Sequence, residues 1–262
     1  MIKFSIITAV YNREKTIAQS IKSVKSQNYP KDFLEHIIID GLSSDGTLDI
    51  VKNTISENSI IISELDNGIN DALNKGLKLA TGDIVGLMHS DDFFADDYVL
   101  SDIKNAFQDP FVDIVYGDLD YVSFNDSSKV VRSWKSKPFN IEYLSNGWMP
   151  PHPTIFLRRS LISRFGVFDD ASYRISADYD MMIRYFKIPN ITPVYIPRVL
   201  VKMRIGGESN KNLLKILIKM HEDYKIIKAN KVGGFITLLY KNIGKISQFN
   251  LFKFKIVKSF LK

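Results

Sequence analysis

Short apolar runs alternate with amphipathic stretches over most of the first two hundred residues. Four of these runs are almost continuously apolar, which is typical of strands buried on both faces of a sheet. They cover residues 4–11, 36–40, 59–63 and 84–88. Between them, apolar residues recur at helical spacing, as at Ile17, Ile21 and Val24. The alternation predicts an α/β domain with a mostly parallel central sheet and helices on both faces.

The pattern continues beyond residue 92 with less regular spacing. We expect helices at 97–107, 160–165 and 176–187, and strands at 112–122, 130–134, 154–157 and 193–203. No apolar run reaches the roughly 18 residues that a membrane-spanning helix needs, and the N-terminus lacks the pattern of a signal peptide. We therefore expect a cytoplasmic protein.

Charge divides the 262 residues into two unequal parts. The formal net charge is +6, but residues 211–262 contain twelve lysines and only two acidic residues, Glu222 and Asp223. That segment carries a charge of +10, whereas residues 1–210 carry −4. We expect a catalytic domain over 1–210 and a basic helical tail over 211–262.

The tail contains two amphipathic patterns. The first is an apolar helical stripe that we expect to pack on the catalytic domain: Leu213, Leu217, Met220, Tyr224 and Ile227. In the second, at 249–262, apolar residues oppose three lysines, as in helices that lie on a membrane surface. We expect the tail to contact an anionic membrane. Because its cations are all lysines, we expect no nucleic-acid partner.

Composition excludes several kinds of site. The chain has no cysteine, so disulfides, thiolate catalysis and cysteine-bound zinc are excluded. The four histidines are scattered without the spacing of metal ligands. His152 lies between prolines, where it either contacts a substrate or forms hydrogen bonds within its loop. The glycine-rich dinucleotide fingerprint and the phosphate-binding loop motif are both missing from the sequence.

Two adjacent carboxylates, Asp91 and Asp92, follow the strand predicted at 84–88. Ligands bind at the carboxyl edge of open α/β sheets. A pair of carboxylates there suits Mg²⁺ or Mn²⁺, which would keep coordination positions for a diphosphate. The alternative for this pair is a solvated acidic loop.

Two earlier strand ends carry further polar candidates. Tyr11 is placed to stack on a base and Arg13 to meet a phosphate, although an ordinary aromatic at the end of a strand explains Tyr11 equally well. For Asp40 we favour contact with a nucleotide, because Gly41 already serves the turn. For Asp45 we favour a turn and helix-capping role.

Two more acidic clusters open helices. Asp71 and Lys75 form an i, i+4 pair that serves either a substrate or helix stability. Asp180 precedes Arg184 by four residues and is expected to form a structural ion pair. Asp178 has no such partner and is the better candidate for a general base.

Taken together, six segments resemble family 2 glycosyltransferases with the GT-A fold, and most closely the bacterial enzymes that build O-antigen or exopolysaccharide repeat units. The segments are residues 4–12, 39–47, 68–76, 81–92, 176–180 and 203–209. The resemblance covers roughly residues 1–210. It implies a nucleotide-sugar half over about 1–92 and an acceptor half over about 93–210.

The resemblance implies an inverting, metal-dependent hexosyltransferase that uses a UDP-linked donor with Mn²⁺ or Mg²⁺. It places the metal on Asp91 or Asp92 and the acceptor proton on Asp178. The residues that it assigns to the nucleotide sugar are Thr8, Ala9, Tyr11, Arg13, Asp40, Asp71, Lys75 and Asp91. Those that it assigns to the acceptor or to support are His152, Asp180 and Arg204.

The chain departs from the family pattern at two positions. His89 stands where many members have an aspartate, which weakens the expected metal site or shifts it to Asp92. Ala177 stands where many have a glutamate, which leaves Asp178 as the only carboxylate for the role of base.

Three functions are compatible with these observations. The first is a transferase, peripheral on the inner face of the cell membrane, that extends a lipid-pyrophosphate-linked saccharide. The second is sugar transfer to polyprenyl phosphate, an acceptor that needs no general base. The third is a non-catalytic module that binds a nucleotide sugar or a membrane and uses its carboxylates as helix caps.

Overall fold

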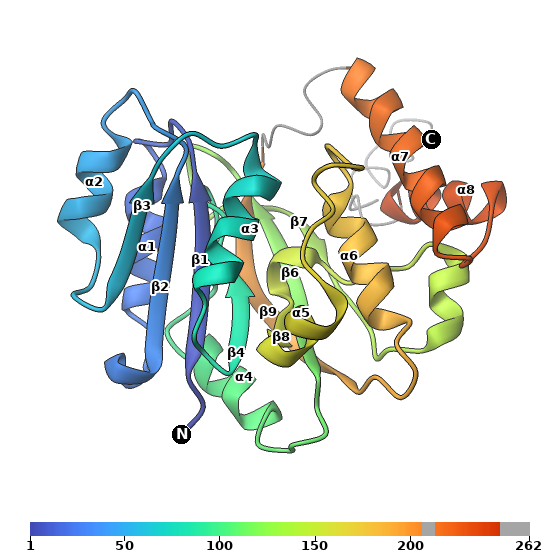
Figure 1. Cartoon of the computed structure of the whole chain (residues 1–262), viewed down its shortest axis with the longest axis horizontal. Helices are drawn as coiled ribbons and strands as arrows, with labels where there is room; N and C mark the ends of the chain where they lie inside the picture. Colours follow the sequence, from blue (N-terminus) through green and yellow to red (C-terminus); the bar gives the residue numbers. More distant parts are fainter. Residues whose placement is uncertain (206–212, 247–262) are drawn as a thin grey trace, which may run out of the picture.

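Strand β1 (Phe4–Val10) is buried along its whole length and is the centre of a four-stranded parallel half-sheet. It pairs with β2 (Leu34–Asp40) on one side and with β4 (Ile84–Leu87) on the other, and β3 (Ser59–Ser63) pairs with β2. The computed structural model describes residues 1–205 and 213–246. In Figure 1 the carboxyl ends of these strands point upward and meet at one edge. This parallel half-sheet confirms the sequence prediction.

Beyond β4 the sheet becomes mixed. Strand β8 (Phe156–Arg158) is antiparallel to both β4 and β6 (Ile114–Val122), whereas β9 (Pro193–Arg204) is parallel to β6. Strand β7 (Val130–Trp134) forms the predicted hairpin with β6, and the short β5 (Phe93–Phe94), which the sequence pattern did not predict, pairs with β9. The mixed half therefore begins at β4, the strand whose following turn carries Asp91 and Asp92.

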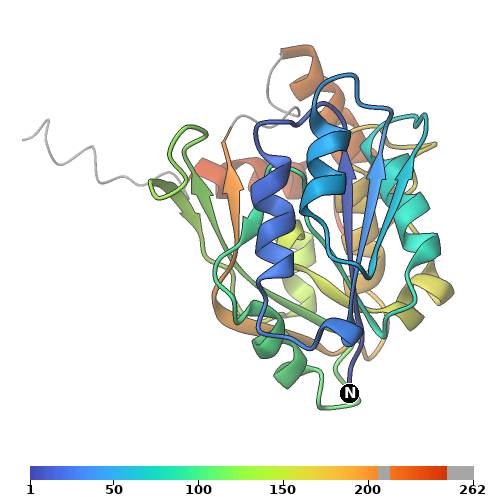
Figure 2. The same cartoon turned by 90° about the vertical axis from the view of Figure 1, so that its left-hand side faces the viewer.

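Helices cover both faces of the sheet, as predicted (Figure 2). One face carries α1 (Ile17–Lys25), α2 (Thr47–Thr54) and α4 (Val99–Ala106). The other carries α3 (Ile69–Leu79), α5 (Arg159–Phe165) and α6 (Ala177–Phe186). Short 3₁₀-helices lie at Lys31–Phe33, Ile141–Asn146 and His152–Thr154.

Alternation along β1 decides which side chains meet which helices. Ile7 and Ala9 pack with the helices of the second face, and Phe4 and Ile6 pack with those of the first. Gly76 lets α3 approach the sheet closely, because a Cβ there would lie 2.4 Å from Ile7 Cγ2. The strand is thus buried on both sides, which is why its sequence is almost continuously apolar.

Two helices, α7 (Leu213–Ala229) and α8 (Phe235–Ile246), lie beside α6 (Figure 1). The predicted inner stripe of α7 is wrong for most of its length, because Leu217 is 57% exposed while Glu222, Asp223 and Asn230 are buried. Polar groups at the start of α6, which need hydrogen-bond partners, determine which face of α7 turns toward α6. Helix α8 was not predicted, and the predicted helix at 249–262 lies outside the described residues. None of the helices described is both long and apolar enough to cross a membrane.

Candidate active site

The turn after β4 brings the adjacent carboxylates to the carboxyl edge of the sheet. Asp91 is half-buried and Asp92 is fully buried. Asp92 Oδ1 accepts a hydrogen bond from the backbone N–H of Arg204 (3.3 Å), whose guanidinium donates to the backbone carbonyl of Asp91 (2.5 Å) and to Gln19. Arg204 thereby ties the end of β9 to this turn. Burial and the neighbouring charge of Asp91 raise the pKa of Asp92 well above its usual value.

The side chains at this turn fit a divalent cation that is held largely by its substrate. Asp92 Oδ2 is buried and has no hydrogen-bond partner among the described residues. Over residues 1–205 and 213–246, no group of three or more potential ligands is suited to hold a metal by itself. Mg²⁺ needs only one or two protein carboxylates when substrate phosphates complete its coordination. Asp91, with Asp92 behind it, is such a donor set.

A chain of two imidazoles links this turn to the start of α6. His89 Nε2 lies 3.0 Å from His152 Nε2, and His152 Nδ1 lies 3.3 Å from Asp178 Oδ2. The side chains of His152 and Asp178 are 25% and 30% exposed, so both remain accessible from solvent. The structure therefore joins three residues that lie far apart in the sequence. His152 is fixed by a short 3₁₀ turn between prolines.

The charge of Asp178 favours one direction for this chain. An ionised carboxylate 3.3 Å away favours a proton on His152 Nδ1, and His152 Nε2 is then the acceptor toward His89. Burial lowers the pKa of His152 to about 4 despite the opposing charge of Asp178, and burial also lowers the pKa of His89. Burial acts to raise the pKa of Asp178, but His152, Lys219 and Lys241 hold it below the usual value. At neutral pH this chain therefore consists of the Asp178 carboxylate and two neutral imidazoles.

Helix α7 supports the backbone that carries Asp178. Glu222 is buried and its carboxylate accepts hydrogen bonds from the backbone N–H groups of Arg174 (2.9 Å), Ile175 (2.9 Å) and Ser176 (2.8 Å). Ser176 is the N-cap of α6 but makes no side-chain capping bond. These donors belong to the segment that leads into α6 rather than to the first turn of the helix, and the helix dipole favours a carboxylate at this end. Glu222 thus fixes the approach to α6.

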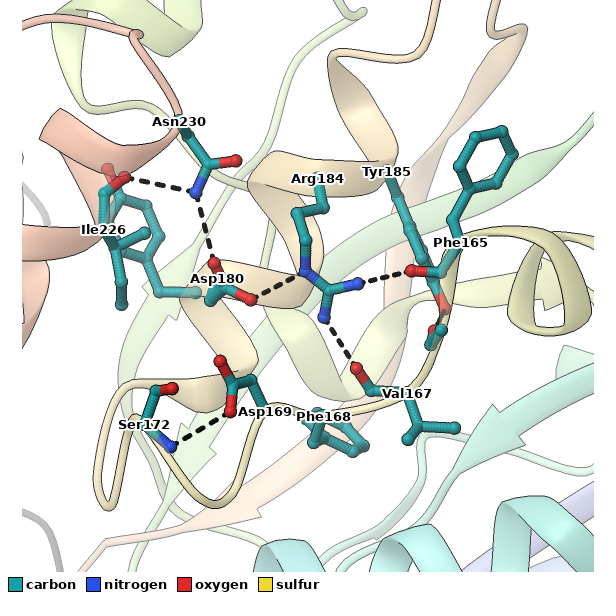
Figure 3. Close-up of polar contacts among 12 residues, drawn as sticks. Phe165, Val167, Phe168, Asp169, Ser172, Asp180, Arg184, Tyr185, Ile226 and Asn230 are labelled. Carbon is teal, nitrogen blue, oxygen red and sulfur yellow. Dashed lines mark hydrogen bonds and ion pairs between the residues drawn. The ribbon is translucent and has the colours of Figure 1, made fainter.

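A second network fixes α6 from its middle (Figure 3). Asp180 accepts from Arg184 Nε (2.7 Å) and from Asn230 Nδ2 (3.1 Å), and the same guanidinium donates to the carbonyls of Phe165 and Val167 (2.6 Å each). The predicted Asp180–Arg184 ion pair is confirmed. Asp180 is only 5% exposed and fully engaged, so its observed contacts are structural.

Ion pairs and hydrogen bonds of Asp71 and Lys75 stabilise the loop before α3. Lys75 Nζ contacts Glu64 (2.9 Å), the carbonyl of Leu65 (2.7 Å) and Asp71 (3.6 Å), and Asp71 also accepts from the N–H of Asn67 (2.9 Å). The predicted Asp71–Lys75 pair is therefore present and shapes this loop.

The strand ends assigned to the nucleotide differ in exposure. Tyr11 is 56% exposed, but Thr8 and Ala9 are buried, and Thr8 Oγ1 is engaged with His36 (2.9 Å). Asp40 is fully buried and accepts from Ser63 Oγ (2.6 Å) and from the N–H of Ser43. These contacts shape the carboxyl ends of β1 and β2, and a nucleotide role for these residues stays a prediction.

Two further residues, Arg13 and Asp45, lie just beyond the ends of β1 and β2. Arg13 donates to the backbone carbonyls of Tyr11 (3.3 Å) and Asn12 (3.0 Å), so its guanidinium lies at the predicted nucleotide end. Asp45 accepts from the N–H of Thr47 (3.0 Å) at the start of α2, which is the turn role that the sequence predicts.

Sequence reasoning missed the residues that connect separate elements. It did not predict the His89–His152 contact, the three backbone bonds of Glu222, or the pair of bonds between Asn74 and the backbone of Phe168. One signal was visible: Glu222 and Asp223 are the two acidic residues in a lysine-rich tail. An acidic residue that is isolated in this way is a candidate for a specific buried contact.

Comparison with known proteins identifies relatives of this chain. The model of the family described as glycosyl transferase family 2 matches residues 5–181. A PGL/p-HBAD biosynthesis glycosyltransferase of Mycobacterium bovis is 32% identical over 223 residues, which is 82% of each chain. Poly(ribitol-phosphate) beta-N-acetylglucosaminyltransferase TarS of Staphylococcus aureus is 35% identical over 96 residues, which is 36% of this chain and 17% of TarS.

Solved structures share the fold at low sequence identity. S. aureus TarS 1–349 in complex with UDP-GlcNAc is similar with a TM-score of 0.65 and 19% identity, over 88% of this chain and 66% of that one. The mannosyltransferase PcManGT from Pyrobaculum calidifontis, in complex with GDP-Man and Mn²⁺, gives a TM-score of 0.63 and 18% identity, over 92% and 69%. The chain spans 39% of the longer TarS structure. These matches establish a GT-A glycosyltransferase fold.

Proposed function

Because the chain belongs to glycosyl transferase family 2, we propose that it transfers a hexose with inversion from a UDP-linked donor to a hydroxyl group of a lipid-linked saccharide, in the synthesis of a bacterial O-antigen or exopolysaccharide. The observation that carries the proposal is the partly exposed Asp178 carboxylate, which His152 contacts at 3.3 Å. The names of the relatives, which act in PGL/p-HBAD biosynthesis or on poly(ribitol-phosphate), support a cell-surface acceptor.

Asp178 is suited to be the general base. Its lowered pKa keeps the carboxylate ionised at neutral pH. It accepts the proton of the acceptor hydroxyl as that oxygen attacks the anomeric carbon from the face opposite the diphosphate. The bond between the anomeric carbon and the diphosphate oxygen breaks, and the electron pair leaves with the diphosphate. An α-linked donor then gives a β-linked product.

The remaining residues have roles in binding and positioning. His152 orients Asp178 through its Nδ1–H, and His89 in turn donates to His152. Asp91, with Asp92, would hold Mn²⁺ or Mg²⁺, which supplies positive charge at the diphosphate when bound. Tyr11, Arg13 and the backbone around Thr8 and Ala9 form the nucleotide end of the donor site, with Asp40 beneath them.

The outer surface of α7 and α8 supports contact with an anionic membrane. Large apolar side chains there are more than half exposed: Leu217, Phe235, Ile236, Tyr240 and Ile243. Lysines are interspersed among them in the sequence. Apolar side chains mixed with cations suit the interface of an anionic bilayer. A peripheral position on the inner face of the cell membrane would bring the site to a lipid-pyrophosphate acceptor.

The direct test is a matrix of UDP-, GDP- and dTDP-sugars against synthetic lipid-diphosphate saccharides, with products identified by mass spectrometry. We expect a product that is heavier by one hexose unit with at least one UDP-sugar. UDP binding without transfer to any hydroxyl acceptor, or transfer only to polyprenyl phosphate, would contradict the proposal.

A further inference from the structure

A small, partly open cavity is lined by the proposed base, Asp178. Its volume is about 40 Å³, and it lies between α3, β4, β8 and α6. Its walls are mostly aliphatic, aromatic or thioether side chains, among them Leu77, Val85, Leu87 and Met182. The hydroxyl of Tyr185 is engaged with the carbonyl of Gly166, so the polar groups of the wall are those of His152 and Asp178, at one side.

The cavity meets the substrate side at the proposed base and its partner. His152 and Asp178 both line it, and both keep part of their side chains exposed to solvent. Leu87, another lining residue, ends β4 four residues before Asp91. A sugar whose diphosphate lies at Asp91 and whose anomeric carbon faces the acceptor beside Asp178 would have the side of the cavity formed by His152 and Asp178 within its reach.

The size and the mostly apolar lining of the cavity restrict which chemical groups can enter it. A water molecule needs roughly 10–15 Å³ of such space, so the cavity accommodates about three water-sized groups. Apolar cavities hold water poorly, because water there would lose its hydrogen bonds. A hydroxyl substituent that enters the part formed by Leu77, Val85 and Leu87 would meet the same difficulty, whereas a methyl group or the methyl end of an acetyl group would not.

We propose that this cavity is a subsite for an apolar substituent of the donor sugar, either the acetyl group of an N-acetylamino sugar or the methyl group of a 6-deoxy sugar. The inference rests on the proposed function, because it takes the donor diphosphate to lie at Asp91. It narrows the donor to sugars that carry such a substituent. Leu77, Val85 and Leu87 would set that specificity.

Matched donors that share a nucleotide test the proposal on the natural protein. One pair is UDP-glucose and UDP-N-acetylglucosamine, and the other is dTDP-glucose and dTDP-6-deoxyglucose. Dissociation constants come from isothermal titration calorimetry with Mn²⁺, and UDP and dTDP alone serve as references. We expect the acetylated or deoxygenated donor of at least one pair to bind about 10-fold more tightly than its hydroxyl partner, the discrimination typical of a small apolar group in an apolar pocket. The pair that discriminates identifies the substituent.

Filling the cavity should remove that preference. Val85→Leu fills it from β4 and Leu77→Phe fills it from α3, so either variant suffices if the other fails to fold. Val130→Leu, on the exposed strand β7, is the matched control and should keep the full preference. A preference below about 2-fold in both pairs, or one that survives filling in a folded variant, overturns the subsite. If neither UDP nor dTDP binds, the proposed function itself fails, and the subsite with it.

Discussion

Glu222 Oε2 accepts a hydrogen bond of 2.8 Å from the backbone N–H of Ser176, two residues before the proposed base Asp178. Glu222 belongs to α7, which lies beyond the residues matched by the family model. Helix α7 therefore contributes directly to the position of the segment that leads into α6. The region matched by the family model and the basic tail are linked by a buried contact.

Replacing this carboxylate should weaken both stability and turnover. Glu222→Gln keeps the size of the side chain but removes the charge and turns one acceptor oxygen into a donor group that faces backbone N–H groups. Hydrogen bonds to charged groups contribute about 1.5–3 kcal/mol, so we expect a loss of that order in the free energy of unfolding. Urea denaturation measures it, with the exposed Glu57→Gln as control. Equal stability of the two variants would show that the backbone hydrogen bonds of Glu222 are dispensable.

Asp91 and Asp92 should respond differently to neutralisation. Asp91→Asn should weaken Mn²⁺-dependent UDP binding by about 10-fold or more, because Asp91 is the accessible carboxylate. Asp92 already has a raised pKa in its buried position, so Asp92→Asn should cost little stability and affect binding less. Calorimetric titration of UDP with Mn²⁺, and again after EDTA, measures both effects. Weaker binding in Asp92→Asn than in Asp91→Asn would reverse the assignment.

Stability should fall in mild acid because of His36, a buried residue of β2. His36 lies away from the carboxylates that follow β4. Burial lowers the pKa of His36 to about 4, from 6.5 in an unfolded chain. Between these values the unfolded chain binds the extra proton and the native protein does not, so the free energy of unfolding decreases as pH falls from about 6.5 to 4. The total decrease in the free energy of unfolding over this pH range is on the order of 3 kcal/mol.

Chemical denaturation at pH 7 and pH 4.5 measures this loss for the natural protein and for His36→Asn. The variant lacks the titrating group, so its stability should change less between the two pH values. An identical pH dependence in both proteins would exclude His36 as a source of the acid sensitivity.

The sequence predicted the parallel half-sheet because each of its strands is a continuous apolar run bounded by polar turns, as in β1 and β2. It predicted the Asp180–Arg184 and Asp71–Lys75 pairs because both are local on a helix. It could not predict the His89–His152 contact or the backbone contacts of Glu222, because each depends on how distant elements pack. The inward face of α7 was mispredicted for the same reason: Glu222 bonds backbone N–H groups just before α6 and Asn230 bonds Asp180 within it, and hydrophobicity alone does not reveal these partners.

The exposed apolar surface of α7 and α8 should bind anionic vesicles. Each buried aliphatic side chain contributes about 1.5–3 kcal/mol, so Leu217→Ser combined with Ile236→Ser should reduce vesicle binding at least 10-fold. Deletion of 249–262 should reduce it further while activity on a detergent-soluble acceptor is retained. Sedimentation with phosphatidylglycerol vesicles in low salt measures binding.

The matched control for this surface is Val130→Ser combined with Val131→Ser, because both valines are 46% exposed on β7. This control should bind vesicles like the natural protein. Vesicle binding that is unchanged by the helix substitutions and by the deletion would refute a membrane role for the C-terminal helices.

The most direct test of the account is the turnover of Asp178→Asn. The amide cannot accept the acceptor proton, so transfer to a saccharide hydroxyl should fall by about 10²–10⁴-fold. UDP binding should persist, because the proposed nucleotide end of the site lies at the ends of β1 and β2, away from α6. Asp170→Asn, at an exposed position just before α6, should keep full activity. Product formed by Asp178→Asn at the rate of the natural enzyme would contradict Asp178 as the base and with it the proposed transfer to a hydroxyl group.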